Sequence, residues 1–158
     1  ESVMILFIIG AAGVFSYMLS SLFITQAIAE WIGTLDVNRW VLMLYVNVFL
    51  LVAGFFLPPV AVILMAAPIL MPIILGAGFD PYWFAVVLTI NMEIGLISPP
   101  VGLNLYVING IAPEIPLKTI LKGSLPYVAC MVVAILILCL FPGIATWLPD
   151  VLMGTAVS

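Results

Sequence analysis

Long apolar runs make up most of this chain, and short polar clusters separate them. The runs at residues 3–23, 39–57, 60–76 and 125–146 come close to or exceed the ~18–20 residues with which an α-helix crosses a bilayer. Residues 82–112 form one more apolar stretch, which a proline pair interrupts. The chain is 66% hydrophobic and 6% charged, with a mean hydropathy of +1.44, which is more apolar surface than a soluble core uses. The pattern predicts an all-α integral membrane protein.

The polar clusters and the prolines divide the chain into segments with different expected positions in the membrane. In residues 24–37, apolar side chains recur at helical spacing on a different face from Gln26 and Glu30, and Trp31 suits the headgroup level. The expected segments are a transmembrane helix at 1–23, an interfacial amphipathic helix at 24–37, a re-entrant hairpin at 38–76, a discontinuous transmembrane helix at 82–112, a surface arm helix at 113–123, a final transmembrane helix at 124–147 and a tail at 148–158.

The hairpin is predicted from the joint between its two apolar arms. Residues 54–59 read Gly-Phe-Phe-Leu-Pro-Pro and contain no polar side chain of the kind found in loops outside the membrane. Non-helical backbone at membrane depth is tolerated only inside protein or beside a water-filled cavity. We therefore expect a re-entrant hairpin that enters and leaves on one side. Two full spans joined by a tight apolar turn remain an alternative.

The second interruption, Ser98-Pro99-Pro100, falls inside an apolar run. Proline lacks an amide donor and clashes with the preceding turn, so a helix cannot continue through it unbroken. Residues 82–97 would be about 24 Å long as a helix and residues 103–112 about 15 Å. Neither reaches the ~30 Å of a bilayer core, but together they do. The sequence therefore predicts a discontinuous transmembrane helix.

Polar residues gather around this second break. Asn91, Gly95 and Ser98 recur at i, i+4 and i+7 and so share one helix face, while Gly102 and Asn104 follow the break. A helix that ends at mid-membrane exposes carbonyls that suit a cation, and the helix that restarts offers amide donors that suit an anionic group. We expect an ion or substrate site here. The alternative is that these polar residues are interhelical hydrogen-bonding groups.

Glu93 lies roughly 160–200° around the helix from that polar face, at 100° per residue. It is not expected to bind the same ion, although an acid within an apolar run is by default a functional candidate. A structural pair or a protonated acid that is hydrogen-bonded within the bundle is the alternative. A lone acid in a chain with no histidine has no partner for acid–base or nucleophilic chemistry, so we expect no enzyme activity.

The few charges exclude one class of partner and suggest an orientation. Three Lys/Arg and seven Asp/Glu residues give a net charge of −4, and no basic cluster is present to neutralise phosphates, so nucleic-acid binding is not expected. Lys118 and Lys122 predict a cytoplasmic connection by the positive-inside rule, with Arg39 on the other side. The chain opens at Glu1 directly into an apolar helix, and we expect it to be a piece of a longer protein.

Several motifs together resemble the C-terminal part of the large membrane subunit of tripartite ATP-independent periplasmic (TRAP) transporters, the DctM family. The resemblance covers essentially the whole chain, and its most specific part is the Ser-Pro-Pro-Val-Gly core. The segments that carry it are residues 91–104 (NMEIGLISPPVGLN), 110–112, 123–127, 141–142 and 147–149, with Gly-Phe-Phe at 54–56 and Pro-x-x-x-Pro at 68–72.

The resemblance implies a secondary transporter of the bacterial inner membrane that is driven by a Na⁺ gradient. Its substrate would be an organic anion, such as a C4-dicarboxylate or sialic acid, delivered by a periplasmic binding protein. It implies an elevator motion, an inverted-repeat fold of which this is the second half, and a small four-helix membrane subunit as partner. By similarity, Na⁺ would be held mainly by backbone at Gly54, Gly95, Ser98 and Val101. The midplane site would include Asn91, Pro99, Pro100, Gly102 and Asn104.

Two departures from the family pattern matter. Relatives commonly have an acidic or polar residue just after the Gly-x-Phe tip, where this chain has Leu57 followed by two prolines. The first half of the inverted repeat also lies outside these 158 residues, so the chain would hold half of a site and would not transport alone. The alternative to a transporter is a structural or assembly membrane subunit whose helices are merely kinked.

Overall fold

The computed structural model describes residues 2–34, 38–100 and 102–153, and this part of the chain is helical, without a β-strand. The prediction of an all-α membrane protein is confirmed, because α3, α4 and α7 are each long and apolar enough to cross a bilayer. The helices are α1 (Ser2–Ser21), α2 (Ile24–Thr34), α3 (Arg39–Phe56), α4 (Pro59–Gly76), α5 (Pro81–Ile97), α6 (Leu103–Ile111), α7 (Leu117–Leu140) and α8 (Gly143–Met153).

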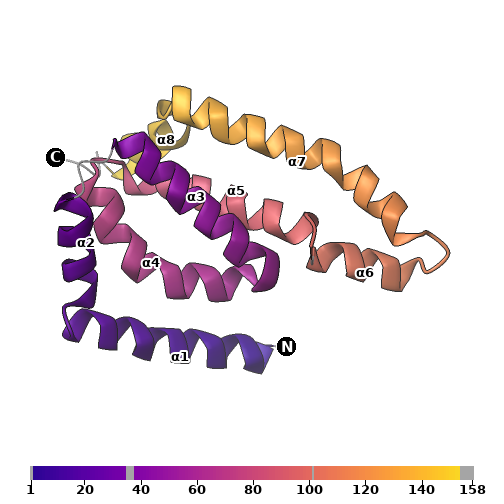
Figure 1. Ribbon diagram of the computed structural model, residues 1–158, viewed down its shortest axis with the longest axis horizontal. Helices are drawn as coiled ribbons and strands as arrows, with labels where there is room; N and C mark the ends of the chain where they lie inside the picture. Colours follow the sequence, from indigo (N-terminus) through magenta and orange to yellow (C-terminus); the bar gives the residue numbers. More distant parts are fainter. Residues whose placement is uncertain (1, 35–37, 101, 154–158) are drawn as a thin grey trace.

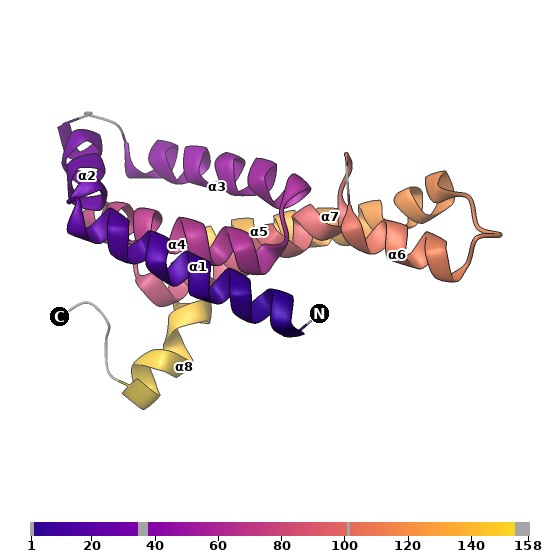
Figure 2. The ribbon, with the colours of Figure 1, turned by 90° about the horizontal axis from the view of Figure 1, so that it is seen from below.

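In Figure 1, α1, α5, α6 and α7 run along the long axis of the molecule, and α2 lies across it at one end. Helices α5 and α6 follow one another along this axis, and α7 returns beside them in contact with both. Helices α3 and α4 form a hairpin that contacts α5, while α1 and α2 pack on α4. Figure 2, turned by 90°, shows α8 directed away from the other helices. The tip of the hairpin lies beside the C-terminal end of α5, and α6 extends beyond it (Figure 1).

Side-chain caps fix where α3 and α5 begin. The Asn38 side chain accepts a hydrogen bond from the Trp40 amide at 2.9 Å. The Asp80 carboxylate accepts from the amides of Tyr82 at 2.7 Å and Trp83 at 3.1 Å, and a proline occupies the first helical position of α5. Such a cap stabilises a helix start by about 1 kcal/mol, because it satisfies amides that have no partner within the helix.

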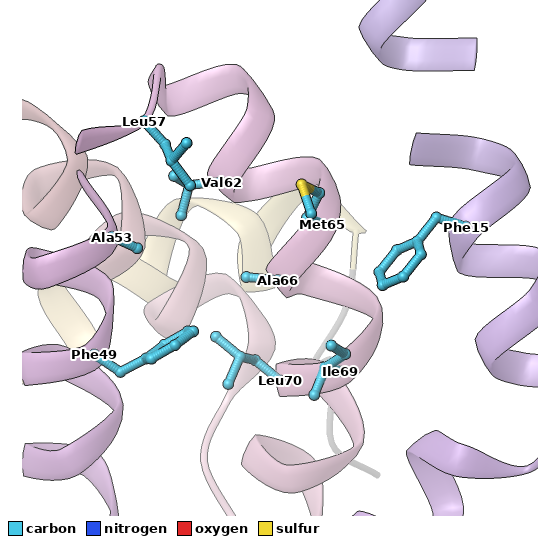
Figure 3. A pocket seen from close by; sticks show the side chains of 9 residues that line it. All are labelled: Phe15, Phe49, Ala53, Leu57, Val62, Met65, Ala66, Ile69 and Leu70. Atoms are coloured by element: carbon cyan, nitrogen blue, oxygen red, sulfur yellow. The ribbon is translucent and has the colours of Figure 1, made fainter. Parts of the chain in front are cut away.

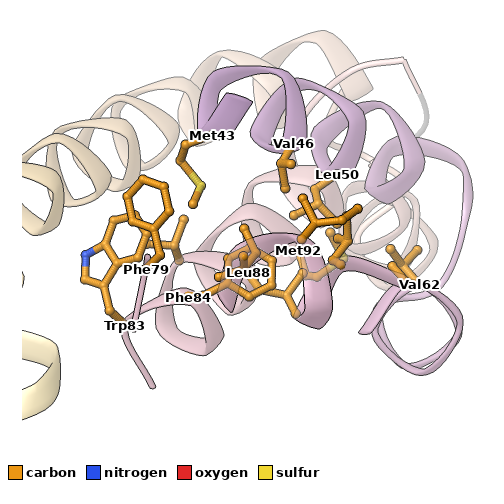
Figure 4. Packing of buried hydrophobic residues seen from close by; sticks show 14 of the residues in the cluster. Met43, Val46, Leu50, Val62, Phe79, Trp83, Phe84, Leu88 and Met92 are labelled. Carbon is orange, nitrogen blue, oxygen red and sulfur yellow. The ribbon is translucent and has the colours of Figure 1, made fainter. Parts of the chain in front are cut away.

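The apolar core lies between α3, α4 and α5, as Figure 4 shows. Most of its side chains come from one face of each of these helices, so the buried positions recur at helical spacing along α3 and α5. Phe79, between α4 and α5, and Leu138 of α7 complete it. The residues labelled in that view are Met43, Val46, Leu50, Val62, Phe79, Trp83, Phe84, Leu88 and Met92.

Trp83 extends the core to α7. Its indole nitrogen Nε1 donates a buried hydrogen bond to the Leu138 carbonyl at 2.7 Å, and its ring stacks on Phe79 at 5.2 Å between centroids. The Leu138 carbonyl needs this donor because the residue four positions later is Pro142, which has no amide. The start of α5 is therefore attached to the end of α7.

The C-terminal helices differ in their bounds from those expected. Helix α7 runs from Leu117 to Leu140 without a break at 123/124, the expected boundary between the surface arm and the final span. The polar cluster at Lys118 and Lys122 marks where the helix leaves the apolar run, but polar residues of this kind do not end a helix. The helix ends instead just before Pro142, and α8 occupies part of the expected tail.

Residues 35–37 of the expected interfacial helix and 154–158 of the expected tail lie outside the described residues.

The membrane position of the hairpin stays a prediction. Helices α3 and α4 have 18 residues each, which corresponds to about 27 Å of helix. That length fits both a re-entrant hairpin in a tilted arrangement and a pair of full spans.

Candidate functional site

The ends of α3 and α5 meet at two glycines. An ideal Cβ atom built on Gly95 would lie 2.7 Å from both the carbonyl carbon and the carbonyl oxygen of Gly54, and 3.0 Å from its Cα. No other residue fits at position 95 without moving backbone. A Cβ on Gly54 would instead make ordinary contacts, at 3.4 Å from the Met92 Cε and 3.7 Å from the Gly95 Cα. The close approach of the two helices therefore depends on Gly95 more than on Gly54.

Prolines remove the amides that would pair with the carbonyls at this crossing. In an α-helix the carbonyl of residue i accepts from the amide of residue i+4. Pro58 and Pro59 stand four positions after Gly54 and Phe55, so these two carbonyls have no helical donor, whereas the Ala53 carbonyl accepts from the Leu57 amide at 3.0 Å. The backbone hydrogen bonds of α3 therefore end at the Ala53 carbonyl, one residue before the crossing at Gly54.

The same relation holds at the end of α5. Pro99 and Pro100 stand four positions after Gly95 and Leu96, whose carbonyls likewise lack a helical donor. Aligned on their prolines, residues 54–60 and 95–101 both read Gly-x-x-x-Pro-Pro-Val. This match is the sequence signal that identifies the Phe55 and Leu96 carbonyls, which were not among the predicted site residues.

Each carbonyl end is followed by the amide end of the next helix. Helix α4 starts at Pro59, and α6 starts after Gly102, which has the left-handed φ of +56°. A Cβ on Gly102 would lie 2.8 Å from the Leu105 Cδ1 and 3.0 Å from the Ser98 carbonyl oxygen, so both the backbone conformation and the space require glycine. The first amides of α4 and α6 have no carbonyl partner within their helices.

The predicted polar face of α5 is buried, and Glu93 is not. Asn91 is 0% and Ser98 6% exposed, and Gly95 is buried with them, whereas Glu93 is exposed on the other side of the helix. Helical periodicity gave this division correctly. Ser98 is the C-cap residue of α5.

Asn91 contacts α3 rather than the break. Its Nδ2 donates to the Asn47 Oδ1 and to the Val87 carbonyl, the latter at 3.0 Å, and the Asn47 Nδ2 donates to the Met43 carbonyl at 2.8 Å. The Asn91 Oδ1 is buried without a hydrogen-bond partner among the described residues. In this structure Asn91 therefore holds α3 and α5 together, as the interhelical alternative anticipated.

The remaining predicted site residues are divided between the crossing and the surface. Gly54 and Gly95 are brought together, and the Ser98 carbonyl lies next to Gly102. Pro99, Pro100 and Asn104 are exposed around the second break, while Val101 lies outside the described residues. The acceptors that the described residues present at the crossing are therefore backbone carbonyls.

A separate cavity of about 200 Å³ lies beside the hairpin (Figure 3). It is apolar, and it differs in this respect from the crossing, because no charged or hydrogen-bonding side chain lines it. Its lining residues come from α1, α3, α4 and the joint between α3 and α4, and they are Phe15, Phe49, Ala53, Leu57, Val62, Met65, Ala66, Ile69 and Leu70.

The family model of the "Tripartite ATP-independent periplasmic transporter, DctM component" matches residues 1–144. This chain belongs to the DctM family. It is 39% identical over 149 residues to the C4-dicarboxylate TRAP transporter large permease protein DctM of Pseudomonas aeruginosa, covering 94% of this chain and 35% of that protein. It is 31% identical over 141 residues to the sialic acid TRAP transporter large permease protein SiaM of Vibrio cholerae, covering 89% and 33%.

The name of a third relative mentions a different substrate. The ectoine TRAP transporter large permease protein TeaC of Halomonas elongata is 33% identical over 147 residues, covering 92% of this chain and 34% of that protein. The chain thus spans about a third of the length of these relatives. The expected family is confirmed, and it is a family of membrane transporter permeases rather than of enzymes.

Proposed function

We propose that this DctM-family chain is part of a secondary transporter that couples Na⁺ entry to the import of an organic anion of the C4-dicarboxylate or sialic-acid type. It would act in the bacterial inner membrane with a small four-helix membrane subunit and a periplasmic binding protein that delivers the substrate. The family assignment supports the general features, and the names of the relatives span dicarboxylate, sialic acid and ectoine.

The observation that carries the ion-coupling proposal is the crossing of α3 and α5. The carbonyls of Gly54 and Gly95 belong to two helices that approach within van der Waals contact, and neither has a helical amide partner. A backbone carbonyl that is buried without a donor is costly, and a bound cation would remove that cost.

The donor set fits Na⁺ by its chemistry. A hard cation prefers oxygen ligands, and carbonyl oxygens at two helix C-termini carry the partial negative charge of the helix dipole. Gly54, Gly95 and Ser98 would supply these oxygens, with Val101 as a further backbone candidate by family similarity. The amide ends of α4 and α6 offer the opposite polarity and suit a carboxylate of the substrate.

The packing also supports an elevator motion. The hairpin is joined to α5 by the contact of Gly54 with Gly95 and by the Asn47–Asn91 hydrogen bond, so the two elements can move as one body. The hairpin tip ends beside the middle of the α5–α6 unit rather than beside its far end, as a re-entrant hairpin requires (Figure 1).

One observation favours the structural alternative at a single position. Asn91, which was expected to contribute to the midplane site, instead hydrogen-bonds α3. We assign it a structural role within the transporter, and Gly95 and Ser98 keep the proposed role at the ion site.

The test is uptake of labelled organic acids by the full-length protein, reconstituted in proteoliposomes with its binding protein and its small subunit. An inside-negative potential is applied, and Na⁺ is either present or replaced by choline. We expect uptake that depends on Na⁺ and is lost in Ser98→Ala or Gly95→Leu. Uptake with the same rate in choline would refute coupling to Na⁺ and favour a different driving ion or a structural subunit.

A further inference from the structure

A serine of α7 reaches the end of α5 beside the proposed ion site. The Ser124 Oγ lies 3.1 Å from the Ile97 carbonyl oxygen and 2.9 Å from the Leu121 carbonyl oxygen of its own helix. We propose that Ser124 is a positioning residue that holds the Ile97 carbonyl on α7 and thereby fixes the last turn of α5 for ion binding. This inference rests on the proposed Na⁺ coupling.

The first step is to account for the carbonyls in the last turn of α5. Gly95 and Leu96 lose their donors to Pro99 and Pro100, and Ile97 is the last residue of the helix. A turn with several unpaired carbonyls is free to fray, since it lacks the hydrogen bonds that hold a helix end. The hydroxyl of Ser124 supplies one donor to this turn from outside the helix.

The second step concerns direction. Ser124 approaches Ile97 from α7, whereas Gly54 approaches Gly95 from α3. Helices α3 and α7 each contact α5. The last turn of α5 is therefore held by contacts with two helices, because the Ile97 carbonyl is bound by Ser124 of α7 and Gly95 lies against the Gly54 backbone of α3.

The third step is that Ser124 has a local alternative. A hydroxyl has one proton, so Ser124 donates either to Leu121 in α7 or to Ile97 in α5, or shares the proton between them. The bond to Leu121 is available to any serine at this place in an isolated helix. Only the bond to Ile97 joins the two helices, and it is the one that the packing of α5 against α7 creates.

Loss of the Ser124 donor is expected to weaken Na⁺ binding and to leave substrate binding unchanged. Without it the last turn of α5 must be ordered when Na⁺ binds, and this ordering opposes binding. For Ser124→Ala in the full-length protein we expect the Na⁺ concentration for half-maximal uptake to rise by roughly three- to tenfold, the range that one net hydrogen bond corresponds to. The KM for the organic acid, measured at saturating Na⁺, should stay unchanged.

Three variants separate this role from a general packing effect. Ser124→Thr keeps the hydroxyl and should restore the wild-type Na⁺ requirement. Thr119→Ala removes an exposed hydroxyl from the same helix. Thr89→Val removes a hydroxyl that donates only to Ala85 in its own helix, at 2.9 Å. Both control variants should leave the Na⁺ requirement as in the wild type.

Hydrogen–deuterium exchange supplies a readout that does not depend on transport. Ser124→Ala should speed amide exchange in peptides that cover residues 93–98, the last turn of α5, and peptides around Trp83 and Leu138 should exchange as in the wild type. A Na⁺ requirement and an exchange rate that both remain unchanged in Ser124→Ala would overturn the role of Ser124. If the wild-type protein itself shows no Na⁺ dependence, the proposed function fails, and the exchange data alone decide whether Ser124 holds the helix end.

Discussion

The two helix breaks of this protein share one spacing of glycine and proline, but they constrain the chain differently. In both, carbonyls at a helix end lose their donors to a proline pair four positions later. At the first break the chain turns back as a hairpin, and at the second it continues from α5 into α6 (Figure 1). A Cβ atom has room at Gly54 of the first break, whereas at Gly95 of the second break it would meet backbone atoms at 2.7 Å.

The difference indicates which break is built rigidly. The second has Gly95 against backbone, Gly102 in the left-handed region, and a hydroxyl from α7 on its last carbonyl. The first has the apolar Leu57 as its cap residue and an apolar cavity beside it. We infer that the second break is the fixed part of the proposed ion site and that the hairpin tip is the part that adjusts to it.

The largest effect should come from adding one methyl group at Gly95. In Gly95→Ala the new Cβ would lie 2.7 Å from the Gly54 backbone, so the helices must separate. We expect a loss of about 1–3 kcal/mol of stability and a fall in Na⁺-dependent uptake on the order of 100-fold, since small displacements at a site are costly.

Gly54→Ala is the matched variant on the other helix. Its Cβ makes contacts no closer than 3.4 Å, so uptake should stay within about threefold of the wild type. Uptake and thermal unfolding of the purified full-length protein measure both variants. Equal losses in the two would show that the asymmetry of the crossing does not matter.

Much of this comparison could be predicted from the sequence, because proline acts locally. The proline pairs predicted the positions of both breaks. Helical periodicity correctly separated the buried Asn91 and Ser98 from the exposed Glu93. The Gly-x-x-x-Pro-Pro-Val match between the two breaks was also present in the sequence and identifies the unpaired carbonyls.

The contacts that brace the second break could not be predicted. The partners Ser124 and Ile97 are 27 residues apart, and Trp83 and Leu138 are 55 apart. Such pairs depend on how α7 packs along α5, and no local pattern encodes that packing. The continuity of α7 through residues 123/124 was missed for a related reason, since a helix does not need to end where its sequence becomes polar.

Gly102→Ala tests whether the second break needs its left-handed residue. The left-handed conformation costs a non-glycine residue about 1–2 kcal/mol, and the new Cβ would also lie 3.0 Å from the Ser98 carbonyl oxygen. Gly78→Ala is the matched control, because Gly78 has a φ of +76° but no atom within 4 Å of its Cβ position. We expect thermal unfolding to show a loss larger by about 1 kcal/mol for Gly102→Ala than for Gly78→Ala. Equal losses would mean that the space around Gly102 is not restrictive.

Trp83→Phe tests the hydrogen bond that joins the start of α5 to the C-terminal end of α7. The variant keeps an aromatic ring in the core but leaves the Leu138 carbonyl without its donor, and we expect a loss of about 1 kcal/mol in stability. The Na⁺ requirement should not change, in contrast to Ser124→Ala at the other end of α7. Trp40→Phe, at a more exposed ring that contacts the same Phe79, is the control. A raised Na⁺ requirement in Trp83→Phe would mean that the two ends of α7 act on the ion site together.

The smallest effect on ion binding should come from Glu93→Gln. Glu93 is exposed on the side of α5 away from the crossing, so its charge is not available to an ion between Gly54 and Gly95. We expect the half-saturating Na⁺ concentration to stay within about twofold of the wild type, while expression or folding yield changes, because an acid within an apolar segment needs a protein or water environment. Western blotting and Na⁺ titration of uptake separate the two effects. A large rise in the Na⁺ requirement at a normal protein level would place Glu93 in the ion pathway and would remove the distinction between the two faces of α5.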